Sequence, residues 1–100
     1  MSLESITTQI EAKLARAAGL QNRVKFDFGE DGIVFVDNTQ SPPVVSHEDE
    51  EADVVLSTSM GTFEAILNGS KDPNIAFMMG QLKIKGSMGL AMKLSSILEE

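Results

Sequence analysis

The chain contains no cysteine, so disulfide bonds, thiolate metal sites and cysteine nucleophiles are excluded. Its only histidine, His47, lies in the acidic stretch VVSHEDEE, and every Ser-His-Asp arrangement would have to use it. The sequence also lacks a GxGxxG motif, a Walker A loop and a nucleophile elbow. We therefore expect no enzymatic activity, no catalytic residues and no cofactor.

Long apolar runs and targeting signals are missing as well. No run approaches the roughly 18–20 residues that cross a bilayer. The N-terminal MSLESITTQIEAKL lacks the apolar segment of a signal peptide, and the C-terminal ILEE is not a peroxisomal signal. These features favour a cytoplasmic protein, and the 100 residues predict a single domain spanning 1–100.

Basic residues are absent between Phe26 and Ser70, a stretch that carries ten acidic residues. Residues 1–25 sum to +2 and residues 71–100 to +1, which with −10 gives the formal net charge of −7. A broad basic face is therefore not expected, and neither is nucleic-acid binding.

The apolar periodicity predicts an α+β fold. The predicted elements are helices over 3–18, 60–68, 73–79 and 88–98, a hairpin over 24–37, two short strands within 43–58 and a strand over 81–86. Ser59 or Thr58, Asp72 with Pro73, and Ser87 are the expected helix starts. In IVFV both faces are apolar, which indicates a strand covered on both sides. The order suggests a mostly antiparallel sheet of about five strands, with four to five helices packed on one face.

The acidic stretch HEDEEAD lies between two of the predicted strands. It lacks the alternating ligands and the central glycine of an EF-hand loop, so we interpret it as a solvated turn between edge strands and expect no metal site. Asp53 opens the following strand and is expected to tie its own turn together.

The stretch FMMGQLKIKGSMGLAMKL holds four of the six methionines. The final helix carries one apolar stripe of Leu90, Leu94, Ile97 and Leu98. Its second stripe, with Met88 and Met92, exceeds what a surface helix needs. The surplus can pack in the core, line an apolar ligand site or form a protein interface, and the pattern by itself favours core packing.

The segment DPNIAFMMGQLKIKGSMGLAMKL closely resembles the signature of the sterol carrier protein 2 (SCP-2) family. The matching residues are Gly69, Lys71, Asp72, Pro73, Ala76, Phe77, Met78, Gly80, Leu82, Lys83, Ile84, Gly86, Met88, Lys93 and Leu94, with Ala52 and Asp53 upstream. Gln81 and Ser70 depart from the pattern. The resemblance covers most of the chain and is typical of stand-alone bacterial members.

This resemblance implies a five-stranded sheet and helices that enclose an apolar tunnel. It implies non-enzymatic binding and transfer of sterol-like lipids, fatty acids or fatty acyl-CoA, with transient membrane contact. The alternative is an accessory domain that binds a protein partner or a quinone-type isoprenoid intermediate. The expected lipid-binding residues are Phe26, Ile33, Phe35, Ile66, Phe77, Met78, Met79, Leu82, Ile84, Met88 and Met92. The expected contacts to a headgroup or phosphate are Lys83, Lys85 and Lys93.

Overall fold

The computed structural model describes residues 2–15, 22–40 and 43–99. The strands are β1 (Arg23–Asp27), β2 (Ile33–Asp37), β3 (Val44–Ser46), β4 (Val54–Thr58) and β5 (Leu82–Gly86). The helices are α1 (Leu3–Ala15), α2 (Met60–Leu67), α3 (Pro73–Met78) and α4 (Met88–Glu99), with a short 3-10 turn at Gly29–Asp31. The predicted helix over 3–18 is confirmed up to Ala15, and its last three residues lie outside the described ones.

The five strands form one sheet in the order β3-β2-β1-β4-β5. The pairs β1–β2, β2–β3 and β4–β5 are antiparallel, whereas β1–β4 is parallel. The α+β fold with a mostly antiparallel sheet is therefore confirmed. The acidic stretch 47–53 connects β3 at one edge to β4 in the interior, so the prediction that it joins two edge strands is wrong for β4. The reason is that β1 has one side left after the hairpin with β2, and β4 occupies it.

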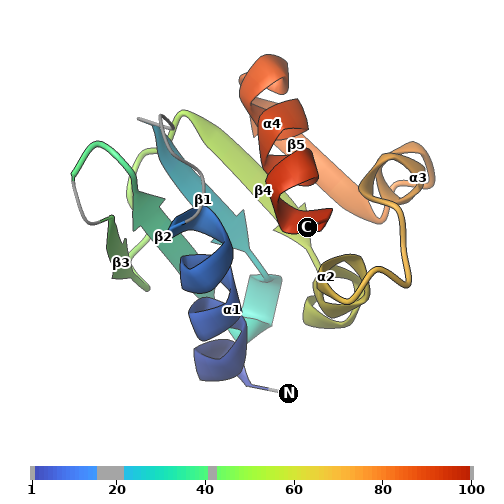
Figure 1. Ribbon diagram of the computed structural model, residues 1–100, viewed down its shortest axis with the longest axis horizontal. Coiled ribbons are helices and arrows are strands. Elements are labelled where there is room, and N and C mark those ends of the chain that lie inside the picture. Colours follow the sequence, from blue (N-terminus) through green and yellow to red (C-terminus); the bar gives the residue numbers. More distant parts are fainter. Residues whose placement is uncertain (1, 16–21, 41–42, 100) are drawn as a thin grey trace.

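The helices gather on one side of the sheet, with α1 and α4 lying across the same face (Figure 1). α3 lies beside the edge strand β5. Apolar residues from the covered face meet the helices in one core, in which Phe63 of α2 lies 5.2–5.3 Å from the rings of Phe26 and Phe28. Within the described residues, no helix has the length and hydropathy needed to cross a bilayer.

Short polar side chains begin three of the helices, as the sequence predicts. The hydroxyl of Ser59 accepts a hydrogen bond from the N–H of Thr62 at 3.1 Å. The carboxylate of Asp72 accepts one from the N–H of Asn74 at 2.8 Å, with Pro73 in the first helical turn. Ser87 caps α4 in the same way through the N–H of Leu90 at 3.2 Å. These caps satisfy backbone donors that have no partner inside a helix, and so fix where α2, α3 and α4 begin.

Candidate functional site

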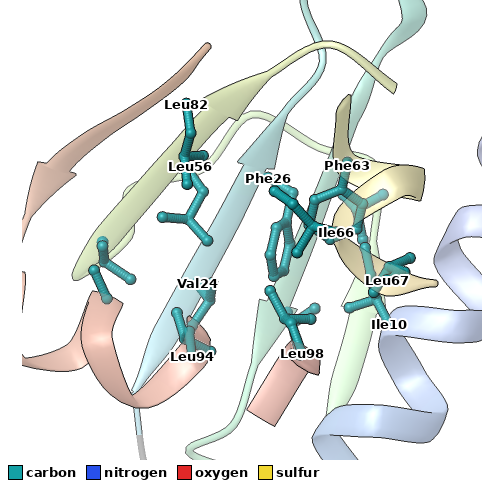
Figure 2. Close-up of a cluster of buried hydrophobic side chains, with 14 of the residues drawn as sticks. Ile10, Val24, Phe26, Leu56, Phe63, Ile66, Leu67, Leu82, Leu94 and Leu98 are labelled. Carbon is teal, nitrogen blue, oxygen red and sulfur yellow. The ribbon is translucent and has the colours of Figure 1, made fainter. Parts of the chain in front are cut away.

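Four of the expected lipid-binding residues lie together on the helix-covered side of the sheet. The register pairs Leu56 with both Phe26 and Ile84, so these three side chains share one face, and Leu82 follows on the same face. Phe26, Ile66 and Leu82 are buried and Ile84 is half-buried against the same core. Figure 2 shows Leu82 beside Leu56 on β4, and Ile66 of α2 beside Phe26. These residues form a continuous apolar wall beneath the helices.

Ile33 and Phe35 lie on the opposite face of the sheet. Phe26 pairs with Val34, and the residues on either side of Val34 therefore point away from the helices. An apolar lining beneath the helices cannot include Ile33 and Phe35, so their expected place in it is corrected. Sequence alternation alone did not show which side of β2 the helices would cover.

The segment that follows β3 covers this opposite face. Phe35 is only 5% exposed, and its cross-strand neighbour Lys25 forms an ion pair with Asp49 at 2.5 Å. Nδ1 of His47 lies 2.9 Å from the carbonyl oxygen of Ile33. The interpretation of IVFV as a strand covered on both sides is thus confirmed, with helices on one face and an acidic segment on the other.

A hollow of about 300 Å³ opens beside Phe35 on this second face. Its lining is Arg23, Phe35, Asp37, Gln40, Val44, Ser46, Glu48 and Glu50. It is mostly polar and acidic, unlike an apolar lipid site. In the described part of the chain, no group of three His, Asp or Glu side chains is placed to hold a metal ion.

Phe77 and four of the methionines are exposed. Met78 is 82% exposed, Met79 67% and Met92 69%, while Met88 is about half exposed. α3 buries Pro73 and Ala76 instead, and α4 buries Leu90, Ala91, Leu94 and Leu98. The interpretation of these methionines as ordinary core residues is therefore wrong. Each helix is short and touches the sheet along one side, so its second apolar side is left on the surface.

Ile75, which is not among the residues expected from the sequence, is also exposed on α3. Its spacing of three and four residues from Met78 and Met79 was the signal available in the sequence. The outward positions of Lys83 and Lys85 on β5 are confirmed, and Lys93 on α4 is exposed as well. Exposed apolar side chains and lysines thus come from the same three consecutive elements, α3, β5 and α4.

Residues 3–99 match the family described as the SCP-2 sterol transfer family. The chain belongs to this family. It is 54% identical over 48 residues to hydroxysteroid dehydrogenase-like protein 2 of Xenopus tropicalis, a match that covers 48% of this chain and 12% of that protein. It is 41% identical over 54 residues to human sterol carrier protein 2, covering 54% of this chain and 10% of that protein. The matched segment is thus a small part of each of these longer relatives.

The fold of this SCP-2 family member is also that of solved family structures. The solution structure of palmitated SCP2L2 from Aedes aegypti superimposes with a TM-score of 0.72 at 19% identity, covering 100% of this chain and 96% of that chain. This likeness shows that the five-stranded sheet and its helices are arranged as in that protein.

The SCP-2 signature maps onto positions that build the fold. Asp72 and Pro73 begin α3, and Gly80 ends it with a backbone φ of 75°. Gly86 ends β5 at a φ of 105°, where an added Cβ would lie 2.3 Å from the carbonyl oxygen of Asp53. These features explain why the signature predicts the fold well. The assignment of individual residues to a ligand stays a prediction.

Proposed function

We propose that this SCP-2 family member binds an apolar lipid and transfers it without covalent chemistry, as a cytoplasmic carrier. The observation that supports the proposal most is the exposed apolar surface of α3 and α4 beside the buried apolar wall. A chain of this size rarely leaves so many large apolar side chains in water without a binding role. Fatty acyl chains, sterol-like lipids and acyl-CoA are the proposed ligand class.

The proposed ligand lies against the wall of Phe26, Ile66, Leu82 and Ile84. The exposed side chains Phe77, Met78, Met79, Met88 and Met92 form the proposed entrance. The core residues beneath the helices are packed, so uptake requires that α3 or α4 move outward. Methionine suits such an entrance because its unbranched thioether chain adapts to changing shapes.

The energetics of a carrier follow from the nature of the ligand. Burying a 16-carbon chain is worth on the order of 10 kcal/mol relative to water, at about 0.8 kcal/mol per CH2. A bilayer offers the same apolar surroundings, so the exchange between bilayer and protein is close to neutral. Small differences in free energy between bilayer and protein are therefore enough to load and unload the lipid, and no chemical energy is needed.

Displacement of a fluorescent fatty acid by palmitate, with mass spectrometry of lipid extracted from the purified protein, tests the proposal. The substitution Ile84→Phe fills the wall on the helix side and is expected to weaken uptake several-fold. Val55→Phe is the matched control, because Val55 is also half-buried but lies on the opposite face of the sheet. Circular dichroism establishes that both variants fold. The absence of co-purified lipid together with no displacement by palmitate contradicts the proposal.

The alternative function, as an accessory domain for a protein partner or a quinone-type isoprenoid, uses the same exposed surface. The displacement assay separates the ligands directly. Stronger displacement by an isoprenoid quinone than by palmitate favours the alternative ligand. Failure of both, with a fully folded protein, favours a protein partner on α3 and α4.

A further inference from the structure

The hollow beside Phe35 lies on the sheet face away from the helices, and the proposed lipid function does not use it. It is at the β3 edge of the sheet, whereas α3 lies beside the opposite edge (Figure 1). Its residues come from β1, β2, β3, the turn after β2 and the acidic segment after β3. Its volume of about 300 Å³ is at the lower end of the range of small-ligand pockets, roughly 300–1,000 Å³. The tertiary structure thus brings together a space that can hold a small group.

The side chains around the hollow carry an excess of negative charge. Asp37, Glu48 and Glu50 supply three carboxylates, and Arg23 supplies one guanidinium group. Nε of Arg23 lies 3.7 Å from a carboxylate oxygen of Asp37, so this cation is already paired. Among the described residues, no Lys, Arg or His side chain forms an ion pair with Glu48 or Glu50. The hollow therefore attracts a further positively charged group.

A buried hydroxyl group gives a second, independent indication of a ligand. The side-chain oxygen of Ser46 is buried and, within the described part of the chain, has no hydrogen-bond partner. Ser46 pairs with Phe35 across the strands, so its side chain is on the same sheet face as the hollow that both residues line. A buried hydroxyl without a partner is unfavourable. Rotation about its Cα–Cβ bond gives the oxygen another staggered position, from which it can accept a hydrogen bond from a ligand in the hollow.

The other lining residues define the chemical class of the ligand. The amide nitrogen of Gln40 donates to Asp37 at 3.3 Å, which leaves the amide oxygen of Gln40 as an acceptor. Val44 is exposed and provides apolar surface for an aliphatic stem. A guanidinium group has five N–H donors in a planar fork and binds carboxylates through two parallel hydrogen bonds, whereas an ammonium group is a compact point charge. Several acceptors around one hollow therefore match a guanidinium group better than an ammonium group.

We propose that this hollow binds the guanidinium group of an arginine-like ligand. Glu48 and Glu50 are its carboxylate partners, and Ser46 is a further acceptor. The inference goes beyond the proposed lipid function and does not rest on it, because the apolar wall and the hollow lie on opposite faces of the sheet.

NMR titration of the ¹⁵N-labelled chain at low salt tests the proposal with butylguanidinium and with butylammonium, which have the same stem. We expect butylguanidinium to give saturable shifts of the amide signals of Ser46, Glu48 and Glu50, and no shift at Leu82 or Ile84 on β5. Butylammonium should bind several-fold more weakly. Equal affinity for both cations, or no saturable shift with butylguanidinium, overturns the proposal.

The same group can come from a small molecule or from an arginine side chain of a protein partner. The peptide acetyl-Gly-Arg-Gly-amide represents the second source in a parallel titration. Tighter binding of the peptide than of butylguanidinium assigns the hollow to an arginine of a partner. Equal or weaker binding of the peptide assigns it to a small guanidine.

Two variants separate the site from the overall charge of the chain. Glu48→Gln with Glu50→Gln is expected to weaken binding of butylguanidinium roughly fivefold or more. Glu30→Gln with Asp31→Asn is the matched control, because it removes the same charge from exposed residues that do not line the hollow. Equal weakening by the two double variants means that only the net charge acts, and overturns the site.

Ser46→Ala tests the role of the hydroxyl group. It should weaken binding of butylguanidinium about two- to fivefold, without lowering stability in urea, because the hydroxyl has no partner in the free chain. Ser57→Ala is the control, since Ser57 is on the same face of the sheet but does not line the hollow. Displacement of the fluorescent fatty acid is measured on the same samples and should stay unchanged. Binding that neither the glutamine nor the alanine variants alter contradicts the proposal, whatever the outcome for the lipid.

Discussion

The carboxylate of Asp53 accepts a hydrogen bond from the backbone N–H of Arg23 at 2.8 Å, and the backbone N–H of Asp53 donates to the Arg23 carbonyl at 2.9 Å. The carbonyl oxygen of Asp53 accepts a third hydrogen bond, from the N–H of Ser87 at 3.2 Å. One residue thus joins the starts of β1, β4 and α4. The expectation was that Asp53 ties its own turn together, whereas the partners of these three hydrogen bonds, Arg23 and Ser87, are far away in the sequence.

We expect Asp53→Ala to lower the free energy of unfolding by about 1–2 kcal/mol, because it removes the acceptor for the Arg23 N–H. Asp53→Asn retains an acceptor oxygen and should cost less. Urea denaturation monitored by circular dichroism measures both. Glu51→Ala, a nearby exposed acid, is the control and should stay within about 0.5 kcal/mol of the original chain. Equal effects at positions 51 and 53 would contradict this account.

The position of Gly86 predicts a second stability effect. Its positive φ of 105° disfavours any side chain, and an added Cβ would lie 2.3 Å from the backbone oxygen of Asp53. Gly86→Ala should therefore destabilise the fold by roughly 1–3 kcal/mol or more. Gly89→Ala is the matched change, since nothing lies within 4 Å of its added Cβ, and it should stabilise α4 by about 0.5–1 kcal/mol. In thermal unfolding, we expect the melting temperature to fall for Gly86→Ala and to rise for Gly89→Ala.

The hydrogen bonds of Asp37 predict that the stability of the fold decreases at acidic pH. Its pKa lies below the ordinary value of 3.8, chiefly because the side chain of Thr39 donates a hydrogen bond to it, and also because the Thr39 N–H donates at 2.9 Å. Because the pKa of Asp37 is depressed in the folded state, its ionised carboxylate stabilises the fold above about pH 4. This stabilisation is lost as the pH falls through the folded-state pKa.

Carbon-detected NMR titration of the Asp37 carboxyl group measures this directly. Thr39→Ala should raise the pKa of Asp37 toward 3.8, because the largest cause of its depression is removed. Thr8→Ala is the control, since that hydroxyl donates to the carbonyl of Glu4 in α1. An Asp37 titration that is the same with and without the Thr39 hydroxyl would refute the assignment.

The aromatic cluster in the core predicts the cost of altering Phe63. Its ring is 1% exposed and contacts both Phe26 and Phe28. Phe63→Leu should lower the free energy of unfolding by roughly 1–3 kcal/mol, because apolar contact and two ring pairs are lost. The same change at exposed Phe77 should cost less than about 0.5 kcal/mol. Urea denaturation of both variants compares a core ring with a proposed entrance ring.

Local patterns predicted the elements of this fold closely. Ser59, Asp72 and Ser87 begin helices as predicted, because a cap needs only backbone donors within three residues of it. The alternation of β5 placed Leu82 and Ile84 inward for a similar reason, since side chains alternate along any strand. The family signature could be recognised in the sequence because its glycines and helix caps depend on the backbone conformation of residues close together in the chain.

The candidate site was less predictable from the sequence. Ile33 and Phe35 have the same apolar character as Val34, and only the pairing of Val34 with Phe26 places them on the face away from the helices. The pattern of the surplus methionines by itself favoured core packing over a ligand site or a protein interface, yet α3 and α4 bury their other sides. Burial depends on which distant elements cover a residue, and that information is absent from local spacing.

The sequence by itself determined the helices, the strands, their caps and the membership of the chain in its family. Each of these depends on residues a few positions apart, where backbone geometry leaves few choices. The tertiary structure alone decided which face of each element is covered, that Asp53 joins three segments, and that Met78, Met79, Met88 and Met92 are exposed. Those outcomes depend on contacts between segments tens of residues apart, which form only when the whole core is packed.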